Sequence, residues 1–103
     1  MPRIRLCAIE EAPAPDKGKR FEVGDGPGIA LFNVDGKYFA VDDNCPHMDA
    51  PLHDAICNRG VITCMWHGWQ FELDTGVSLM SDRITVKRYP VSIEGDTVFI
   101  DLP

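Results

Sequence analysis

The sequence has no long hydrophobic run and no surplus of basic residues. No apolar stretch approaches the roughly 20 residues of a membrane helix, and the residues after Met1 lack the apolar core of a signal peptide. Ten Lys and Arg stand against sixteen Asp and Glu, so the net charge is −6. Nucleic acids and anionic membranes attract basic patches. We therefore expect a cytoplasmic protein that has neither a nucleic acid nor a membrane as its partner.

Helical patterns are absent as well. No segment shows the apolar spacing of an amphipathic helix. The glycine-rich stretch at residues 24–28 lacks the spacing and the lysine of a phosphate-binding loop. The chain has 103 residues, nine of them Gly and eight Pro, which is typical of short strands joined by turns. We predict one all-β domain over residues 1–103.

Short apolar segments between turn residues predict the strands. They cover residues 3–10, 19–23, 29–34, 37–42, 60–63, 68–73, 84–89, 91–94 and 97–102. The clearest signal is the pair Asp35-Gly36 between two apolar runs, because these residues tolerate the positive φ angles of a type I′ hairpin turn. Pro90 lies between the predicted strand segments 84–89 and 91–94, where a proline indicates a sheet edge or a bulge. Trp69 and Phe71 alternate with polar residues, so we expect both in the core.

Cysteine and histidine are few, and most of them are grouped. The chain has four Cys and three His. Cys45 and His47 have one residue between them, sixteen residues follow, and Cys64 and His67 then have two residues between them. Two thiolates and two imidazoles suit either a tetrahedral zinc ion or a two-iron cluster with two ligands per iron. Zinc-binding pairs usually have about two to four residues between them, whereas a one-residue gap lets both side chains face the same side of an extended segment.

This pattern resembles that of the Rieske family. In that family Cys-x-His is followed, after a similar gap, by Cys-x-x-His and a glycine, which is Gly68 here. The resemblance implies one [2Fe–2S] cluster in an antiparallel β-sandwich with an inserted cluster-binding subdomain at about residues 44–68. It places Cys45 and Cys64 on the inner iron and His47 and His67 on the outer iron, where imidazole ligands raise the reduction potential.

Two features of the high-potential members of the family are missing. Those proteins carry an extra cysteine in each ligand loop, joined by a disulfide, and the matching positions here are Ala50 and Trp66. They also carry two hydroxyl groups that hydrogen-bond to the cluster and its cysteine, where this chain has Trp69 and Phe71. Such hydrogen bonds raise the potential. We therefore predict a potential in the low branch of the family.

The chain as a whole resembles the ferredoxin component of multicomponent aromatic-ring dioxygenases. The resemblance implies a monomeric one-electron carrier with no catalytic residues. Its partners would be an NAD(P)H-dependent flavoprotein reductase, as electron donor, and the large subunit of a terminal oxygenase, as acceptor. A mononuclear iron site needs two His and a carboxylate, and His53 is the one histidine left over. The chain is therefore not expected to be an oxygenase by itself.

Two other functions stay open at this stage. The small subunit of a cytoplasmic nitrite reductase shares the fold and length of the family and would be bound permanently to a large partner. A structural or interaction module that binds zinc could use the same four ligands. The zinc protein would be colourless, whereas a Rieske protein is red-brown.

The remaining cysteines and histidine are predicted to be structural. Cys7 and Cys57 are expected to be free, buried or half-buried thiols that take no part in the chemistry. His53 follows His47 by six positions in the same loop. We expect it to be a solvated loop residue and not a ligand.

Apolar and acidic side chains surround the predicted ligands in the sequence. The apolar ones would form a docking patch for a redox partner or shield the cluster from water: Met48, Met65 and Trp66. The acidic ones would form a rim around the cluster or a solvated face: Asp42, Asp43, Asp49 and Asp54.

Overall fold

The structure, a computed structural model, describes residues 3–24, 26, 28–46, 50–65, 68–81 and 83–102. Within these ranges the chain forms ten β-strands and one 3₁₀ turn, η1 (Ile9–Glu11), and no α-helix. The predicted all-β fold is confirmed. In the same ranges, no helix has the length and apolar character that crossing a membrane requires.

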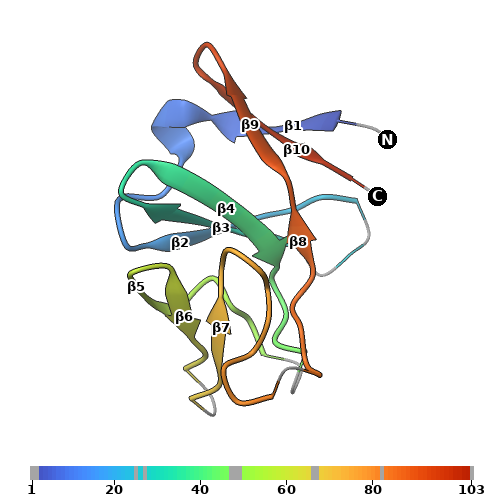
Figure 1. The fold of residues 1–103 in the computed structure, drawn as a ribbon. Coiled ribbons are helices and arrows are strands. Elements are labelled where there is room, and N and C mark those ends of the chain that lie inside the picture. The colour runs from blue at the N-terminus through green and yellow to red at the C-terminus, as the bar shows by residue number, and fades with distance from the viewer. Residues whose placement is uncertain are drawn as a thin grey trace.

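The strands form three antiparallel sheets (Figure 1). The first sheet has the order β1-β10-β9 and consists of β1 (Arg3–Ala8), β10 (Thr97–Asp101) and β9 (Val91–Glu94). The second has the order β2-β3-β4-β8 and consists of β2 (Gly18–Phe21), β3 (Ile29–Val34), β4 (Lys37–Asp42) and β8 (Arg88–Tyr89). The third has the order β5-β6-β7 and consists of β5 (Ile56–Asn58), β6 (Val61–Thr63) and β7 (Gln70–Glu72).

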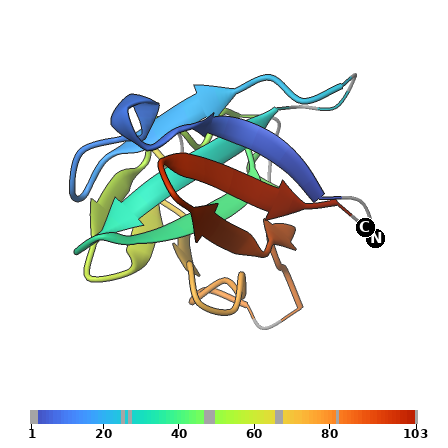
Figure 2. The same cartoon turned by 90° about the horizontal axis from the view of Figure 1, so that it is seen from above.

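The sheets are stacked in layers. In Figure 1 the first sheet is uppermost, the second lies in the middle and the third is at the lower end. Figure 2, seen from above, shows the first sheet in front of the second and both termini close together. The described parts of the connection that follows β4 and of the connection between β6 and β7 lie toward the lower end of the view in Figure 1, away from the termini. These two connections contain the predicted ligand loops.

The middle sheet is buried on both faces, most completely along β3. Ala30 and Phe32 belong to a core cluster that extends to the third sheet, whereas Leu31 belongs to a cluster shared with the first sheet. All three have an exposed fraction of 0%. Successive side chains of a strand point to opposite faces, so a strand covered on both sides needs an unbroken apolar run. The run at residues 29–32 meets that need.

The predicted hairpin turn at Asp35 and Gly36 is confirmed. Their φ angles are 53° and 87°, and the turn joins β3 to β4. A second turn of this kind, at Arg59 and Gly60 with φ angles of 53° and 82°, joins β5 to β6. β5 was not predicted from the sequence, because the strand has only three residues and its turn lacks the Asn-Gly or Asp-Gly pair of a typical hairpin.

Pro90 separates two strands that belong to different sheets. β8 pairs with β4 in the second sheet, and β9 pairs with β10 in the first. Both are edge strands, as predicted from the missing N–H group of proline. The predicted strand at residues 84–89 was too long, since β8 begins at Arg88. Residues 84–86 bond instead to the chain that follows β7, where Thr85 and Val77 form an isolated bridge, and the carbonyl oxygen of Lys87 accepts the N–H of Asp42 at the end of β4.

β1 has an irregularity next to Cys7. The sequence alternation placed Cys7 on the face opposite Ile4 and Leu6. In the structure the register of β1 against β10 shifts between Arg5 and Cys7. Cys7 is consequently only 2% exposed, in the same cluster against which Ile4 and Leu6 pack. The predicted buried thiol is confirmed.

Two glycines with positive φ angles allow a matched test of the packing around the third sheet. Gly76 and Gly95 have φ angles of 79° and 59°, and this region costs other residues roughly 1–2 kcal/mol. A Cβ atom on Gly76 would lie 2.5 Å from the carbonyl oxygen of Val86, whereas a Cβ atom on Gly95 meets nothing within 4 Å. We expect Gly95→Ala to lower the free energy of unfolding by about 1 kcal/mol and Gly76→Ala by at least about 2 kcal/mol more. Chemical denaturation measures both losses, and equal losses would contradict the argument.

Candidate metal centre

Cys45 and Cys64 each begin a loop that is closed in the same way. The Cys45 N–H donates to the carbonyl oxygen of Ala50 at 2.8 Å, and the Cys64 N–H donates to that of Trp69 at 2.7 Å. Each bond connects a cysteine with the residue five positions later. The two loops are therefore matched in length and closure, although they come from different parts of the chain.

The other residues predicted around the cluster lie partly outside the described ranges. His47 is inside the first loop by sequence and His67 is inside the second, and the structure describes neither. The same is true of three of their predicted neighbours: Met48, Asp49 and Trp66.

The two cysteines predicted as ligands are buried in one hydrophobic core cluster, which also contains Cys57. Cys45 and Cys64 are each 1% exposed, and both belong to the cluster between the second and third sheets. Two thiols that two loops bring into one apolar cluster fit a site where thiolates hold iron. Among the described residues, which do not include His47 and His67, no three His, Cys, Asp or Glu side chains come together as metal ligands. The four-residue ligand set therefore stays a prediction.

Gly68 permits the second loop to turn back toward β7. Its N–H donates to the carbonyl oxygen of Cys64 at 2.9 Å, and its φ angle is 72°. Glycine is the residue that adopts this conformation without a steric cost. The backbone conformation of this loop thus explains why a glycine follows the second histidine of the motif in this chain.

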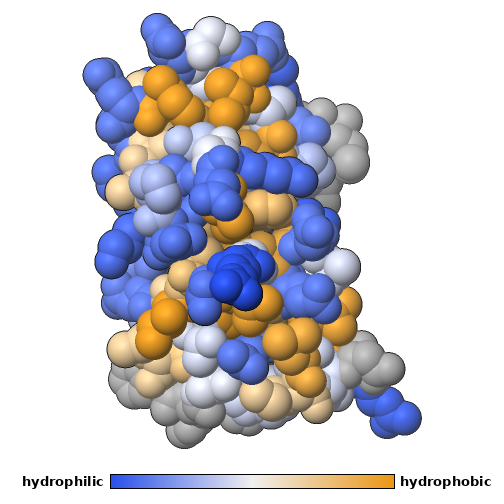
Figure 3. Space-filling view, turned by 60° about the vertical axis from the view of Figure 1, so that its left-hand side comes forward, coloured by the Kyte–Doolittle hydropathy of each residue, from blue (hydrophilic) through white to orange (hydrophobic). Residues whose placement is uncertain are grey.

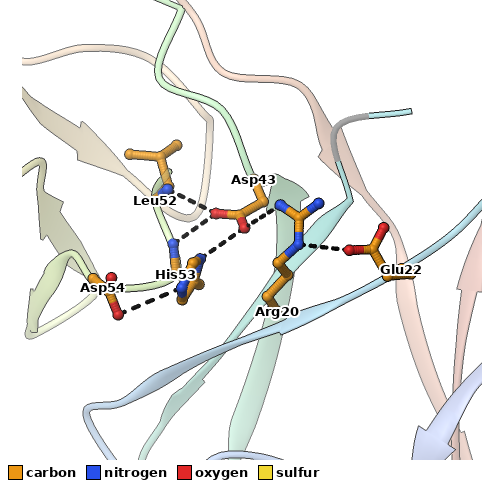
Figure 4. A network of polar contacts seen from close by, with 6 residues as sticks. All are labelled: Arg20, Glu22, Asp43, Leu52, His53 and Asp54. Carbon is orange, nitrogen blue, oxygen red and sulfur yellow. Dashed lines mark hydrogen bonds and ion pairs between the residues drawn. The ribbon is translucent and has the colours of Figure 1, made fainter. Parts of the chain in front are cut away.

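A buried carboxylate secures the base of the first loop (Figure 4). The side chain of Asp43, the residue after β4, is 0% exposed. Its Oδ1 atom accepts the backbone N–H groups of Leu52 and His53, both at 2.7 Å. Its Oδ2 atom accepts a guanidinium N–H of Arg20 at 2.8 Å and lies 2.7 Å from Nδ1 of His53. An ionised carboxylate has about four acceptor positions, and four partners fill them here.

These hydrogen bonds keep Asp43 charged despite its burial. Burial raises the pKa of the carboxyl group, but the bonds from Arg20, from the His53 ring and from the two backbone N–H groups outweigh it, so the pKa lies below its usual value. An ionised carboxylate can only accept hydrogen bonds. The bond to His53 therefore requires the hydrogen to be on Nδ1 of the imidazole.

The structure corrects two predictions for this region. His53 is not a freely solvated loop residue, since its side chain is 29% exposed and its ring lies between Asp43 and Asp54, with Nε2 3.5 Å from Oδ1 of Asp54. Asp43 does not belong to an acidic rim, because its carboxylate is buried. Arg20, which lies 23 positions before Asp43, was not predicted from the sequence as part of this site. The visible signal was an acidic residue two positions before the first cysteine, and it did not indicate a partner.

The comparison with protein families agrees with these loops and this fold. The family model of the Rieske [2Fe-2S] domain matches residues 3–90 of the chain. The chain belongs to the Rieske family. One relative of this Rieske protein is the 3-phenylpropionate/cinnamic acid dioxygenase ferredoxin subunit of Shigella boydii serotype 4 (strain Sb227). It is 36% identical over 107 residues, which cover 100% of this chain and 96% of the relative.

Solved structures show the same fold. The ferredoxin of Sphingomonas yanoikuyae B1 has a TM-score of 0.87 and 33% identity, and the match covers 99% of this chain and 100% of that one. A structure described as an NADH-dependent nitrite reductase small subunit of Mycobacterium tuberculosis has a TM-score of 0.84 and 25% identity, covering 96% and 93%. The predicted family and Rieske-type fold are confirmed. The ferredoxin names of the relatives agree with the prediction of an electron-transfer component and not an enzyme.

The Rieske protein has Trp69 and Phe71 where the high-potential branch has hydroxyl groups. Phe71 is 0% exposed, and Trp69 is partly buried against the hydrophobic core cluster that contains Cys45 and Cys64. The prediction that both pack into the core is confirmed. Neither side chain has a hydroxyl group to donate to a cluster sulfur, so the low-potential prediction stands as made.

The surface beside the second ligand loop combines apolar and polar groups. Met65, which follows Cys64, is 60% exposed, and Ile56 is 58% exposed. Both line an open hollow of about 500 Å³ that His53 and Asp54 also line. The face drawn in Figure 3 is similarly mixed, with hydrophilic side chains across its middle and hydrophobic ones above and below. Met65 is thus available to a partner, and the docking patch remains a prediction.

The two remaining thiols should react slowly in the folded protein. Burial raises the pKa of the Cys7 thiol, with a further contribution from Glu11, and burial followed by the charge of Asp16 raises that of Cys57. The thiolate is the reactive form, and the exposed fractions are only 2% and 7%. We expect an alkylating reagent at pH 8 to label both at least about tenfold more slowly than in denaturant. Peptide mass spectrometry measures this, and rapid labelling of Cys7 in the native state would contradict it.

Proposed function

We propose that the protein is a one-electron carrier with a single Rieske [2Fe–2S] cluster in an aromatic-ring dioxygenase system. The observation that carries this proposal is the burial of Cys45 and Cys64 in one core cluster, each at the start of a matched loop. Each loop has one histidine in its sequence, so the chain offers two sulfur and two nitrogen donors. This donor set is that of a Rieske centre.

In the proposed site the cysteines and the histidines bind different iron ions. Cys45 and Cys64 would hold the inner iron at the core, and His47 and His67 would hold the outer iron nearer the surface. The cluster, when bound, supplies a site that accepts and releases one electron. The apolar side chains around the thiols, among them Leu52, keep water away from the inner part of the site.

The proposed donor is an NAD(P)H-dependent flavoprotein reductase, and the proposed acceptor is the large subunit of a terminal oxygenase. Support comes from the ferredoxin subunit of a dioxygenase that matches the chain over 100% of its length at 36% identity. The proposed carrier is monomeric and meets its two partners in turn. The exposed Met65 beside the second loop offers an apolar contact for them. The cytoplasmic location is part of the same proposal.

The alternatives have weaker support. A nitrite reductase small subunit shares the fold, but the structure described in that way is 25% identical, against 36% and 33% for the two ferredoxins. A zinc module would use the same four donors but does not account for the match to the Rieske family over residues 3–90.

Protein-film voltammetry combined with electron paramagnetic resonance tests the proposal. We expect a red-brown protein, the resonance signal of a reduced two-iron cluster with nitrogen ligands, and a reversible one-electron wave near the low end of the Rieske range, about −150 mV. The missing hydroxyls and disulfide are the reason for the low value. A clearly positive potential would contradict that reasoning. A colourless protein with one zinc per chain would contradict the electron-carrier function itself.

Four single substitutions separate the ligand cysteines from the structural ones. All four thiols are buried, so Cys→Ala removes a similar volume at each position. We expect Cys45→Ala and Cys64→Ala to lose essentially all visible absorption and acid-labile sulfide, because the inner iron would lack a thiolate. Cys7→Ala and Cys57→Ala should keep both. A colourless Cys57→Ala variant, or a fully loaded Cys64→Ala variant, would overturn the assignment.

A further inference from the structure

The bases of the two ligand loops are held in different ways. The second loop lies between β6 and β7, and the pairing of Thr63 with Gln70 fixes its base. The first loop leaves β4, whose neighbours in the sheet are β3 and β8. Where that loop ends, at Leu52 and His53, the chain is not yet in a strand. Strand pairing therefore does not close the first loop at its base.

The carboxylate of Asp43 takes the place of strand pairing. It accepts the backbone N–H groups of Leu52 and His53 at 2.7 Å and so connects the residues on either side of the loop. The backbone hydrogen bond from Cys45 to Ala50 closes a shorter loop within the one that Asp43 closes. The longer loop, from Asp43 to Leu52 and His53, is closed by the Asp43 side chain.

Arg20 fixes that side chain from a distant strand. It extends from β2 and donates to Oδ2 of Asp43 at 2.8 Å. Its guanidinium lies against Gly28, where an added Cβ atom would be 2.8 Å from Cζ. The carbonyl oxygen of Gly28 in turn accepts the backbone N–H of Asp43 at 2.9 Å. Glycine at this position leaves the space that the ion pair occupies.

We propose that the Arg20–Asp43 ion pair is the positioning element of the first cluster-binding loop. It acts by holding the carboxylate against the two backbone N–H groups at the base of the loop. The part of this proposal that concerns the cluster rests on the proposed function, whereas the closure concerns the chain alone. Asp43 lies two positions before Cys45, and Leu52 is in the same buried cluster as Cys45. Charges at such a site are poorly screened by water, so the reduction potential of the proposed cluster should depend on the charges of both Arg20 and Asp43.

Hydrogen exchange on the loaded protein tests the closure. Arg20→Met removes the charge and keeps most of the stem. Glu22→Gln is the matched control, because it removes the negative charge of the exposed partner of Arg20, 2.9 Å away, without altering Asp43. We expect exchange in the peptide spanning residues 50–55 to be at least tenfold faster in Arg20→Met and unchanged in Glu22→Gln. The peptide spanning residues 97–101, in the distant strand β10, should exchange at the same rate in both variants, which separates local opening from general destabilisation.

The reduction potential gives a second readout that packing alone would not move in this way. Loss of the positive charge in Arg20→Met should shift the potential to more negative values. Loss of the negative charge in Asp43→Asn should shift it to more positive values. We expect each shift to correspond to at least a twofold change in the equilibrium between the oxidised and reduced forms, and Glu22→Gln to have no effect. Arg20→Lys, which keeps the charge, should restore most of the potential.

The outcomes separate the two proposals. Unchanged exchange at residues 50–55 in Arg20→Met overturns the positioning role, and so do two potential shifts of the same sign. If Arg20→Met does not fold, Arg20→Gln, which also removes the positive charge, is judged by the same exchange criterion. Absence of a Rieske resonance signal from the unmodified protein would instead refute the proposed function, and the exchange result would still decide the closure.

Discussion

Burial of both faces of the middle sheet is the constraint on which the rest of the structure depends. The first sheet covers one face, and the third sheet together with the ligand loops covers the other. Phe32 of β3 and Cys45 and Cys64 of the loops belong to the same buried cluster. The loops that carry the thiols are therefore part of the hydrophobic core and not appendages to it. A chain of 103 residues can form only a modest hydrophobic core, and here that core also contains Cys45 and Cys64, the two predicted thiolate ligands.

Placing loops in a core creates a need for hydrogen-bond partners. Backbone N–H groups that leave water must be paired. In the described parts of the loops, the N–H of Cys45 is paired with Ala50 and the N–H of Cys64 with Trp69. At the base of the first loop a carboxylate supplies the acceptors. Burying that charge would be costly alone, but Arg20 and His53 offset the cost through short bonds. In the described residues, no buried side-chain nitrogen or oxygen lacks a partner.

The secondary structure could be predicted where local signals were strong. The hairpin around Asp35 and Gly36, with β3 and β4 on either side, agrees with the prediction at both ends, because a turn of that type and two apolar runs specify it locally. β5 was missed because three residues give no pattern. The segment before β8 was predicted as a strand from its composition. Its residues 84–86 bond to the chain at residues 76–78 instead, and Lys87 is where its bonding to β4 begins, through the N–H of Asp42. Pairing partners of that kind are set by tertiary contacts.

The sequence by itself determined the family and the chemistry of the predicted ligands, because donor type and short-range spacing are properties of neighbouring residues. It also determined the all-β class, through turn residues and alternation. Only the tertiary structure decided that the two thiols share one cluster, that Cys7 turns inward at a register shift, and that Asp43 is buried between Arg20 and His53. These facts depend on which side chains meet after the sheets have stacked. An aspartate at a strand end looks the same in the sequence whether it faces water or an arginine 23 positions away.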